Sequence, residues 1–135
     1  MEQAQAAALL DALMNPDNAV REGAEASVRA MRTADAAQFA KLMLDVVGAP
    51  GAFAETQRQM ACTHLRMALV DLHDSIWPRL TTEQKQAVKQ QLLALTETEP
   101  TAVVRRALDS AVSALATYLL AELLPSTKSS SDNGV

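Results

Sequence analysis

The sequence predicts an all-α protein in which three antiparallel helix pairs stack as an α-α superhelix, a solenoid of the HEAT or armadillo-like kind. Its 135 residues include 26 Ala and 18 Leu but only 3% aromatic residues, a composition typical of helices rather than strands. Apolar residues recur at helical spacing in six segments separated by short breaks. The second segment of each pair also carries a related string of residues, which indicates an internal repeat.

The first pair consists of helices expected over residues 2–14 and from about 17 to 31. Leucines on one side make the first segment amphipathic. Pro16 breaks it, because proline cannot continue a helix, and Asp17 or Asn15 can cap the next one.

The second pair begins with Thr33, the expected N-cap of a helix over residues 34–47. Gly48 fits the C-terminal cap of that helix and Pro50 follows it. The next helix is expected from about residue 53 to residue 74, with Leu72 in its apolar stripe. The segment Ile76-Trp77-Pro78 ends it, and we expect Trp77 to belong to the core.

In the third pair, Thr81 and Gln84 have the spacing of a capping box for a helix from 82 to about 97. Pro100 breaks this helix and Thr101 is the expected cap of the last one, over residues 102–124. Residues 125–135 are polar and are expected to form a flexible tail or a loop between repeats.

The repeat is clearest at three arginines, Arg21, Arg58 and Arg105, each near the start of a second helix. The intervals between them match the periods of HEAT and armadillo arrays, and they divide residues 1–124 into repeats of about 1–32, 33–78 and 79–124. A lone helix pair cannot bury its apolar face, so neighbouring pairs share a core. We expect the arginines to be structural. A compact six-helix bundle is the alternative.

Several residues occur in the order found at the N-terminal end of one protein family. They are Leu9-Leu10, Leu13, Asn15-Pro16-Asp17, Val20-Arg21, Ala24-Glu25, Phe39, Leu42, Arg58-Gln59-Met60-Ala61, Leu65-Arg66, Trp77-Pro78, Lys85, Lys89, Leu92-Leu93, Glu99 and Val104-Arg105. Over residues 5–124 the chain resembles the importin-β (karyopherin-β) nuclear transport receptors, and it is most similar to the importin-4 and importin-5 branch. Leu65-Arg66-Met67 departs from the strings that many members carry there.

The resemblance implies that the chain is an N-terminal part of a longer array that works in the nucleus and cytoplasm. In this family the N-terminal repeats bind the GTP form of the small GTPase Ran. Protein cargo and nucleoporins bind mainly further along the array. Because Ran·GTP and cargo bind with negative coupling, nuclear Ran·GTP releases cargo, and no covalent chemistry is implied.

Polar residues opposite the apolar stripes of the second helices are the candidate Ran-binding residues, because mixed charges can recognise a charged GTPase surface. They are Glu22, Glu25 and Arg29, then Gln59, Thr63 and Arg66, and finally Arg106, Asp109 and Ser113. A solvated helix face is the structural alternative for each of them.

The sequence gives no support for an enzyme, a metal site or a cofactor. Cys62 and His64, two residues apart on a helix, point in different directions, as do His64 and His73 if both are helical. Gly48 and Gly51 are not followed by the Lys-Ser/Thr of a phosphate loop. The net charge of −4 disfavours nucleic acid, and no apolar run is long enough for a membrane span.

Two further expectations concern partners. The alternative function is a general HEAT-repeat interaction scaffold with no dependence on Ran. We also expect weak self-association of this chain through an apolar flank of the last helix, at residues such as Val103, Ala107 and Leu120, because terminal repeats normally carry a polar outer face.

Overall fold

The computed structural model describes residues 2–123, and this part of the chain is helical without a strand. The helices are α1 (Gln3–Leu13), α2 (Asn18–Ala34), α3 (Ala36–Val47), α4 (Glu55–Val70), α5 (Thr82–Thr98) and α6 (Ala102–Glu122), with a 3₁₀ turn, η1 (Trp77–Arg79), before α5. Six helices in six expected places confirm the all-α prediction. The last residue of the helix expected to reach 124, and the tail over 125–135, lie outside the described residues.

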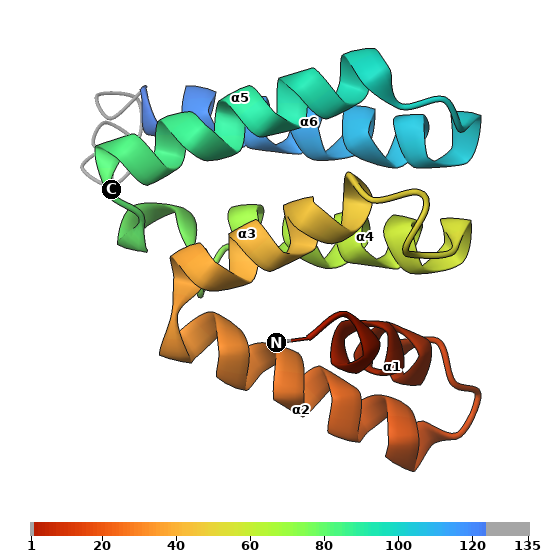
Figure 1. The fold of residues 1–135 in the computed structure, drawn as a ribbon. Helices are drawn as coiled ribbons and strands as arrows, with labels where there is room; N and C mark the ends of the chain where they lie inside the picture. Colours follow the sequence, from red (N-terminus) through yellow and green to blue (C-terminus); the bar gives the residue numbers. More distant parts are fainter. Residues whose placement is uncertain (1, 124–135) are drawn as a thin grey trace.

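The six helices form three pairs arranged as tiers, with α5 and α6 uppermost in Figure 1, α3 and α4 in the middle, and α1 and α2 below. The upper two tiers stack in register, since α6 packs along α4 and α5 packs on α3. The lowest tier joins differently, because α1 is the helix that packs on α4 while α2 contacts α3. The described pairs therefore share a core without repeating one geometry throughout.

The link between α2 and α3 corrects the predicted boundary at Thr33. Helix α2 continues through Thr33 to Ala34, and the extended residue Asp35 both ends α2 and caps α3, its carboxylate accepting a hydrogen bond from Gln38 N at 3.0 Å. Thr33 lies inside the last turn, so its side chain cannot cap the next helix. The expected cap at Asp17 is confirmed, with Ala19 N donating to its carboxylate at 2.9 Å.

Helix α4 is shorter at both ends than predicted. It begins at Glu55 because the Gln57 side chain accepts a hydrogen bond from Ala54 N at 2.9 Å, which leaves Phe53 in the preceding loop. It ends at Val70 because the Asp71 carboxylate accepts hydrogen bonds from His73 N and Asp74 N, forming a turn. The expectation that Leu72 belongs to an apolar stripe is therefore wrong, and its side chain is 91% exposed.

The caps of the third pair are half confirmed. Thr81 and Gln84 form the predicted capping box, with Gln84 N donating to Thr81 Oγ1 at 3.1 Å and Thr81 N donating to Gln84 Oε1 at 2.9 Å. Thr101 occupies the N-cap position of α6, but its side chain makes no capping bond. Its backbone N–H donates instead to the Glu99 carboxylate at 3.0 Å, so that acid takes over part of the expected role.

The core runs through all three tiers. Its largest fully buried side chains are Phe39, Leu10, Met43, Leu44, Leu65, Leu69, Ile76, Leu92, Leu108, Val46, Val47 and Val104. Trp77 is buried as predicted, and the Lys85 ammonium lies 5.7 Å from its ring centroid, close enough for a cation–π interaction.

Candidate functional site

The three aligned arginines make equivalent hydrogen bonds. Arg21 donates to the carbonyl oxygen of Asn15 at 3.2 Å, Arg58 to that of Val47 at 2.9 Å, and Arg105 to that of Glu99 at 3.5 Å. Each acceptor lies at or just beyond the C-terminal end of the first helix of the same pair, where carbonyl groups lack helical partners. The arginines therefore fasten the two helices of a pair together, which is the structural role expected of them.

Arg58 makes a second contact that its two counterparts lack. Its guanidinium also forms an ion pair with the Glu99 carboxylate of the next tier, and the two residues are only 2% and 5% exposed. The other oxygen of Glu99 accepts the hydrogen bond from Thr101 N. A buried charge pair of this kind is tolerated because both charges are matched by hydrogen bonds.

A different cluster joins the lowest tier to the middle one. The Arg32 guanidinium donates to the carbonyl oxygen of Asp74 at 3.0 Å and lies 3.6 Å from the Asp71 carboxylate. Arg79 donates to the carbonyl oxygen of Arg32 at 3.1 Å. Hydrogen bonds from His73 N and Asp74 N, with a smaller contribution from Arg32, lower the pKa of Asp71. Arg32 itself is buried, whereas Asp71 is half-buried and Asp74 and Arg79 are exposed, so the hydrogen bonds of this junction run from the interior to the surface.

His64 lies at the same junction, half-buried on α4. Burial lowers its pKa below 6.5, the charge of Glu25 on α2 opposes this shift, and the charge of Arg32 adds to it. The imidazole is thus neutral at physiological pH and becomes charged only under more acidic conditions.

The nine candidate Ran-binding residues all lie at least partly on the surface. Glu22, Arg29, Gln59, Arg106, Asp109 and Ser113 are exposed, while Glu25, Thr63 and Arg66 are half-buried. Helices α4 and α6, which carry six of these residues, lie side by side. The three residues on α2 are less directly joined to them, because α1 rather than α2 makes the main contact with α4.

Thr63 and Ser113 also contact other parts of the protein. Thr63 Oγ1 donates to the carbonyl oxygen of Gln59 at 3.1 Å, so its hydroxyl is already engaged within α4. Ser113 borders a shallow hollow between α6 and the C-terminal end of α4, which Val70, Leu72 and Tyr118 also line. The surface of α4 and α6 that carries these residues is mixed polar and apolar.

The residues with nucleophilic or metal-binding side chains are placed apart. Cys62 is fully buried, and burial raises the pKa of its thiol to about 11, although Arg66 opposes the shift. His73 lies in the exposed turn after α4 instead of on the helix where we expected it. Over residues 2–123 no three His, Cys, Asp or Glu side chains are grouped so that they could hold a metal ion.

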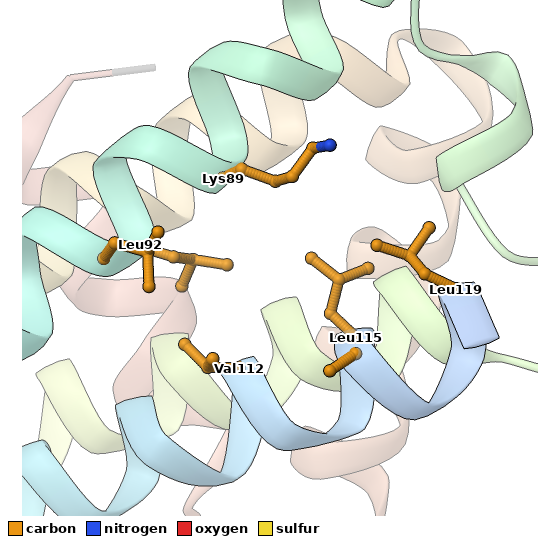
Figure 2. Close-up of a pocket in the computed structure, with 7 residues that line it drawn as sticks. Lys89, Leu92, Val112, Leu115 and Leu119 are labelled. Carbon is orange, nitrogen blue, oxygen red and sulfur yellow. The ribbon is translucent and has the colours of Figure 1, made fainter.

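An apolar groove opens along the outer edge of the uppermost tier, between α5 and α6. Figure 2 shows Leu92 on α5 facing Val112 and Leu115 on α6, with Leu119 further along and the Lys89 ammonium at the rim. The residues predicted to form an apolar flank of the last helix do not line this groove. Leu120 is exposed, but Val103 and Ala107 are half-buried. Val103 is nine residues from Val112, about two and a half turns, so it points to the opposite side of α6.

Sequence reasoning missed two charged residues that matter most to the packing. Glu99 lies at the end of a helix and Arg32 in the last turn of another, where either residue would ordinarily be solvated. Only the position of Glu99 within the family resemblance pointed to it.

No protein-family model matches the chain. Among the described helices none is both long enough and apolar enough to cross a membrane.

Proposed function

We propose that this chain forms the N-terminal helical repeats of a nuclear transport receptor of the importin-β family, and that it binds Ran in the GTP form. The observation that carries the proposal is the order of residues shared with that family across all three helix pairs. The equivalent bonds of Arg21, Arg58 and Arg105 support it, because they give the three pairs a common internal construction.

The partner surface is the face of α4 and α6 that carries Arg66, Arg106 and Asp109, extended by Glu22 and Glu25 on α2. Charges of both signs on rigid helices favour a specific encounter with a charged protein surface and set its orientation. Ran·GTP binding would be coupled negatively to cargo binding elsewhere on the receptor, so that each ligand weakens the other by the same factor.

Binding of purified Ran, loaded with GTP or with GDP, to the immobilised chain tests the proposal. We expect retention of Ran·GTP well above that of Ran·GDP. Arg106→Glu should weaken it at least about tenfold, because a rim charge is reversed. Lys41→Glu is the matched control, since Lys41 is an exposed cation on α3, away from this face.

Equal retention of the two nucleotide forms, or no retention, would overturn the proposal. The remaining function would then be a helical interaction scaffold with no dependence on Ran, since solenoids support many binding tasks.

A further inference from the structure

The hollow between α4 and α6 is a feature of the candidate surface that the charged residues alone do not explain. Its volume is about 560 Å³. Val70 and Leu72, at the end of α4 and on the turn after it, form one wall, and Ala114, Thr117 and Tyr118 of α6 form the other. Val70 and Tyr118 are half-buried, so a side chain seated in the hollow would remove further apolar surface from water.

The hollow stays open whether or not another helix pair follows. The groove of Figure 2, between α5 and α6, lies on the other side of α6, because Val112 follows Ser110 by two residues, a rotation of about 200° around the helix. Both walls of the hollow belong to the second and third pairs. A helix pair stacked beyond α5 and α6 would therefore leave it accessible to a partner.

Leu72, at the rim of the hollow, is exposed on a turn that hydrogen bonds hold in place. Its side chain is 91% exposed, the largest value for a large hydrophobic residue within residues 2–123. The Asp71 carboxylate accepts hydrogen bonds from His73 N at 2.9 Å and from Asp74 N at 3.1 Å, which fixes the backbone of the turn. An apolar side chain on a fixed backbone has little freedom to lose on binding, which is typical of binding anchors.

Two cations flank the hollow. Arg66 lies one turn before Val70 on α4, and Arg106 lies one turn before Ser110 on α6, and residues four apart share a helix face. In the described part of the chain neither guanidinium forms an ion pair. Acidic groups of a partner can therefore neutralise these charges.

The acidic residues of the same region have other partners or positions. Asp71 lies 3.6 Å from Arg32, and Asp74 lies 3.5 Å from Arg79. By helical periodicity Asp109 is on the side of α6 turned away from α4. The surroundings of the hollow therefore favour an apolar group accompanied by acidic ones.

We propose that this hollow anchors the contact with Ran·GTP, receiving a large apolar side chain of the GTPase while acidic groups beside that side chain pair with Arg66 and Arg106. The inference rests on the proposed function and adds to it an apolar contact at Leu72 and Tyr118. A buried apolar anchor supplies much of the free energy of a protein–protein contact, whereas charges around it set the orientation.

Titration of the immobilised chain with Ran·GTP tests the anchor. Leu72→Ala should raise the dissociation constant at least about tenfold, because most of the apolar area of the leucine is lost from the contact. Leu93→Ala is the matched control, since Leu93 is also an exposed leucine but lies on α5. We expect it to change the dissociation constant by less than about twofold.

Thr117→Trp tests the same hollow from the opposite wall. Thr117 is exposed on α6, so an indole placed there fills the hollow without disturbing the core. We expect a loss of Ran·GTP binding as large as that of Leu72→Ala, with far-ultraviolet circular dichroism unchanged from the parent chain.

Salt separates the anchor from the charges around it. Raising the salt concentration from about 0.1 M to about 0.5 M should shrink the fold loss caused by Arg106→Glu, because salt screens exposed charges. The fold loss caused by Leu72→Ala should persist, because an apolar contact is not screened.

The results distinguish this inference from the proposed function. A parent chain that does not prefer Ran·GTP to Ran·GDP would overturn both. A parent chain that does prefer Ran·GTP, with Leu72→Ala and Thr117→Trp binding as tightly as Leu93→Ala, would overturn the anchor alone, as would a Leu72→Ala loss that fades with salt.

Discussion

The two junctions between tiers are built from different chemistry. Between the middle and uppermost tiers, α4 packs along α6, and the Arg58–Glu99 pair that joins these tiers is buried. Between the lowest and middle tiers, Arg32 donates to the carbonyl oxygen of Asp74, and Arg79 donates to that of Arg32. The two arginines also lie near the carboxylates of Asp71 and Asp74, and Asp74 is exposed. Both members of the upper ion pair are thus protected from solvent, whereas at the lower junction Arg32 is buried but Asp74 and Arg79 can exchange their bonds for water. We expect α1 and α2 to separate from the stack more easily than α5 and α6.

We expect the largest loss of stability from a substitution in the buried Arg58–Glu99 ion pair of the upper junction. Glu99→Leu should lower the free energy of unfolding by ~3–5 kcal/mol, because it leaves the Arg58 guanidinium buried without its partner. The double variant Arg58→Met/Glu99→Leu should recover much of that loss, since it removes both charges. Urea denaturation measures both values.

Arg105→Ala is the control for this prediction, because Arg105 occupies the equivalent position but is exposed. We expect it to cost about 1 kcal/mol, because it removes one exposed hydrogen bond to the Glu99 carbonyl oxygen. A Glu99→Leu variant as stable as Arg105→Ala would show that the upper junction does not depend on the pair.

A substitution in the link between α2 and α3, at the lower junction, should have a smaller effect on stability. Asp35→Ala should cost about 1 kcal/mol, because it removes the side chain that caps α3 at the lower junction. Thr33→Ala, two residues earlier inside α2, should change stability by less than half as much. Thermal denaturation of both variants distinguishes them, and equal losses would contradict the observed cap.

The smallest expected effect is a dependence on pH at the lower junction. The pKa of His64 is lower in the folded chain than its ordinary value of 6.5, so the fold favours the neutral imidazole. Its contribution to stability is therefore complete above about pH 6.5 and is lost as the pH falls from there toward the folded pKa. Once the slower intrinsic exchange at lower pH is corrected for, the protection of α2 amides against hydrogen exchange should fall over that range before that of α6 amides does.

His64→Gln should remove this part of the pH dependence, because the amide does not titrate. His73→Gln serves as its control, since His73 is exposed in the turn after α4. If both variants still lose α2 protection as the pH falls, the titrating group lies elsewhere.

The sequence predicts the number and order of the helices well, because proline breaks and capping residues are local signals. It places three helix boundaries wrongly for reasons that are equally physical. Thr33 and Asp35 are both good caps two residues apart, and the sequence does not show which one the chain uses. The turn at Asp71 depends on a carboxylate that accepts two backbone hydrogen bonds, a pattern that a continuing helix would hide.

The relative positions of the candidate Ran-binding residues are harder to predict from the sequence than the helices that carry them. Exposure of Glu22 or Arg106 follows from helical periodicity, whereas adjacency of α4 and α6 depends on how tiers stack. The sequence predicts an apolar flank on the last helix. In the structure α4 and α5 account for most of it, which leaves the narrower edge around Val112 and Ala116.

The three arginine bonds also bear on the order in which the chain is assembled during synthesis. Arg21 and Arg105 reach carbonyl groups only 6 residues behind them, and Arg58 reaches one 11 residues behind, so each helical hairpin can close as soon as its second helix emerges from the ribosome. The Arg58 guanidinium, however, is made 41 residues before the carboxylate that neutralises it. Until Glu99 arrives, the Arg58 guanidinium has only the Val47 carbonyl oxygen and water as partners, so its charge is neutralised only when the last hairpin docks.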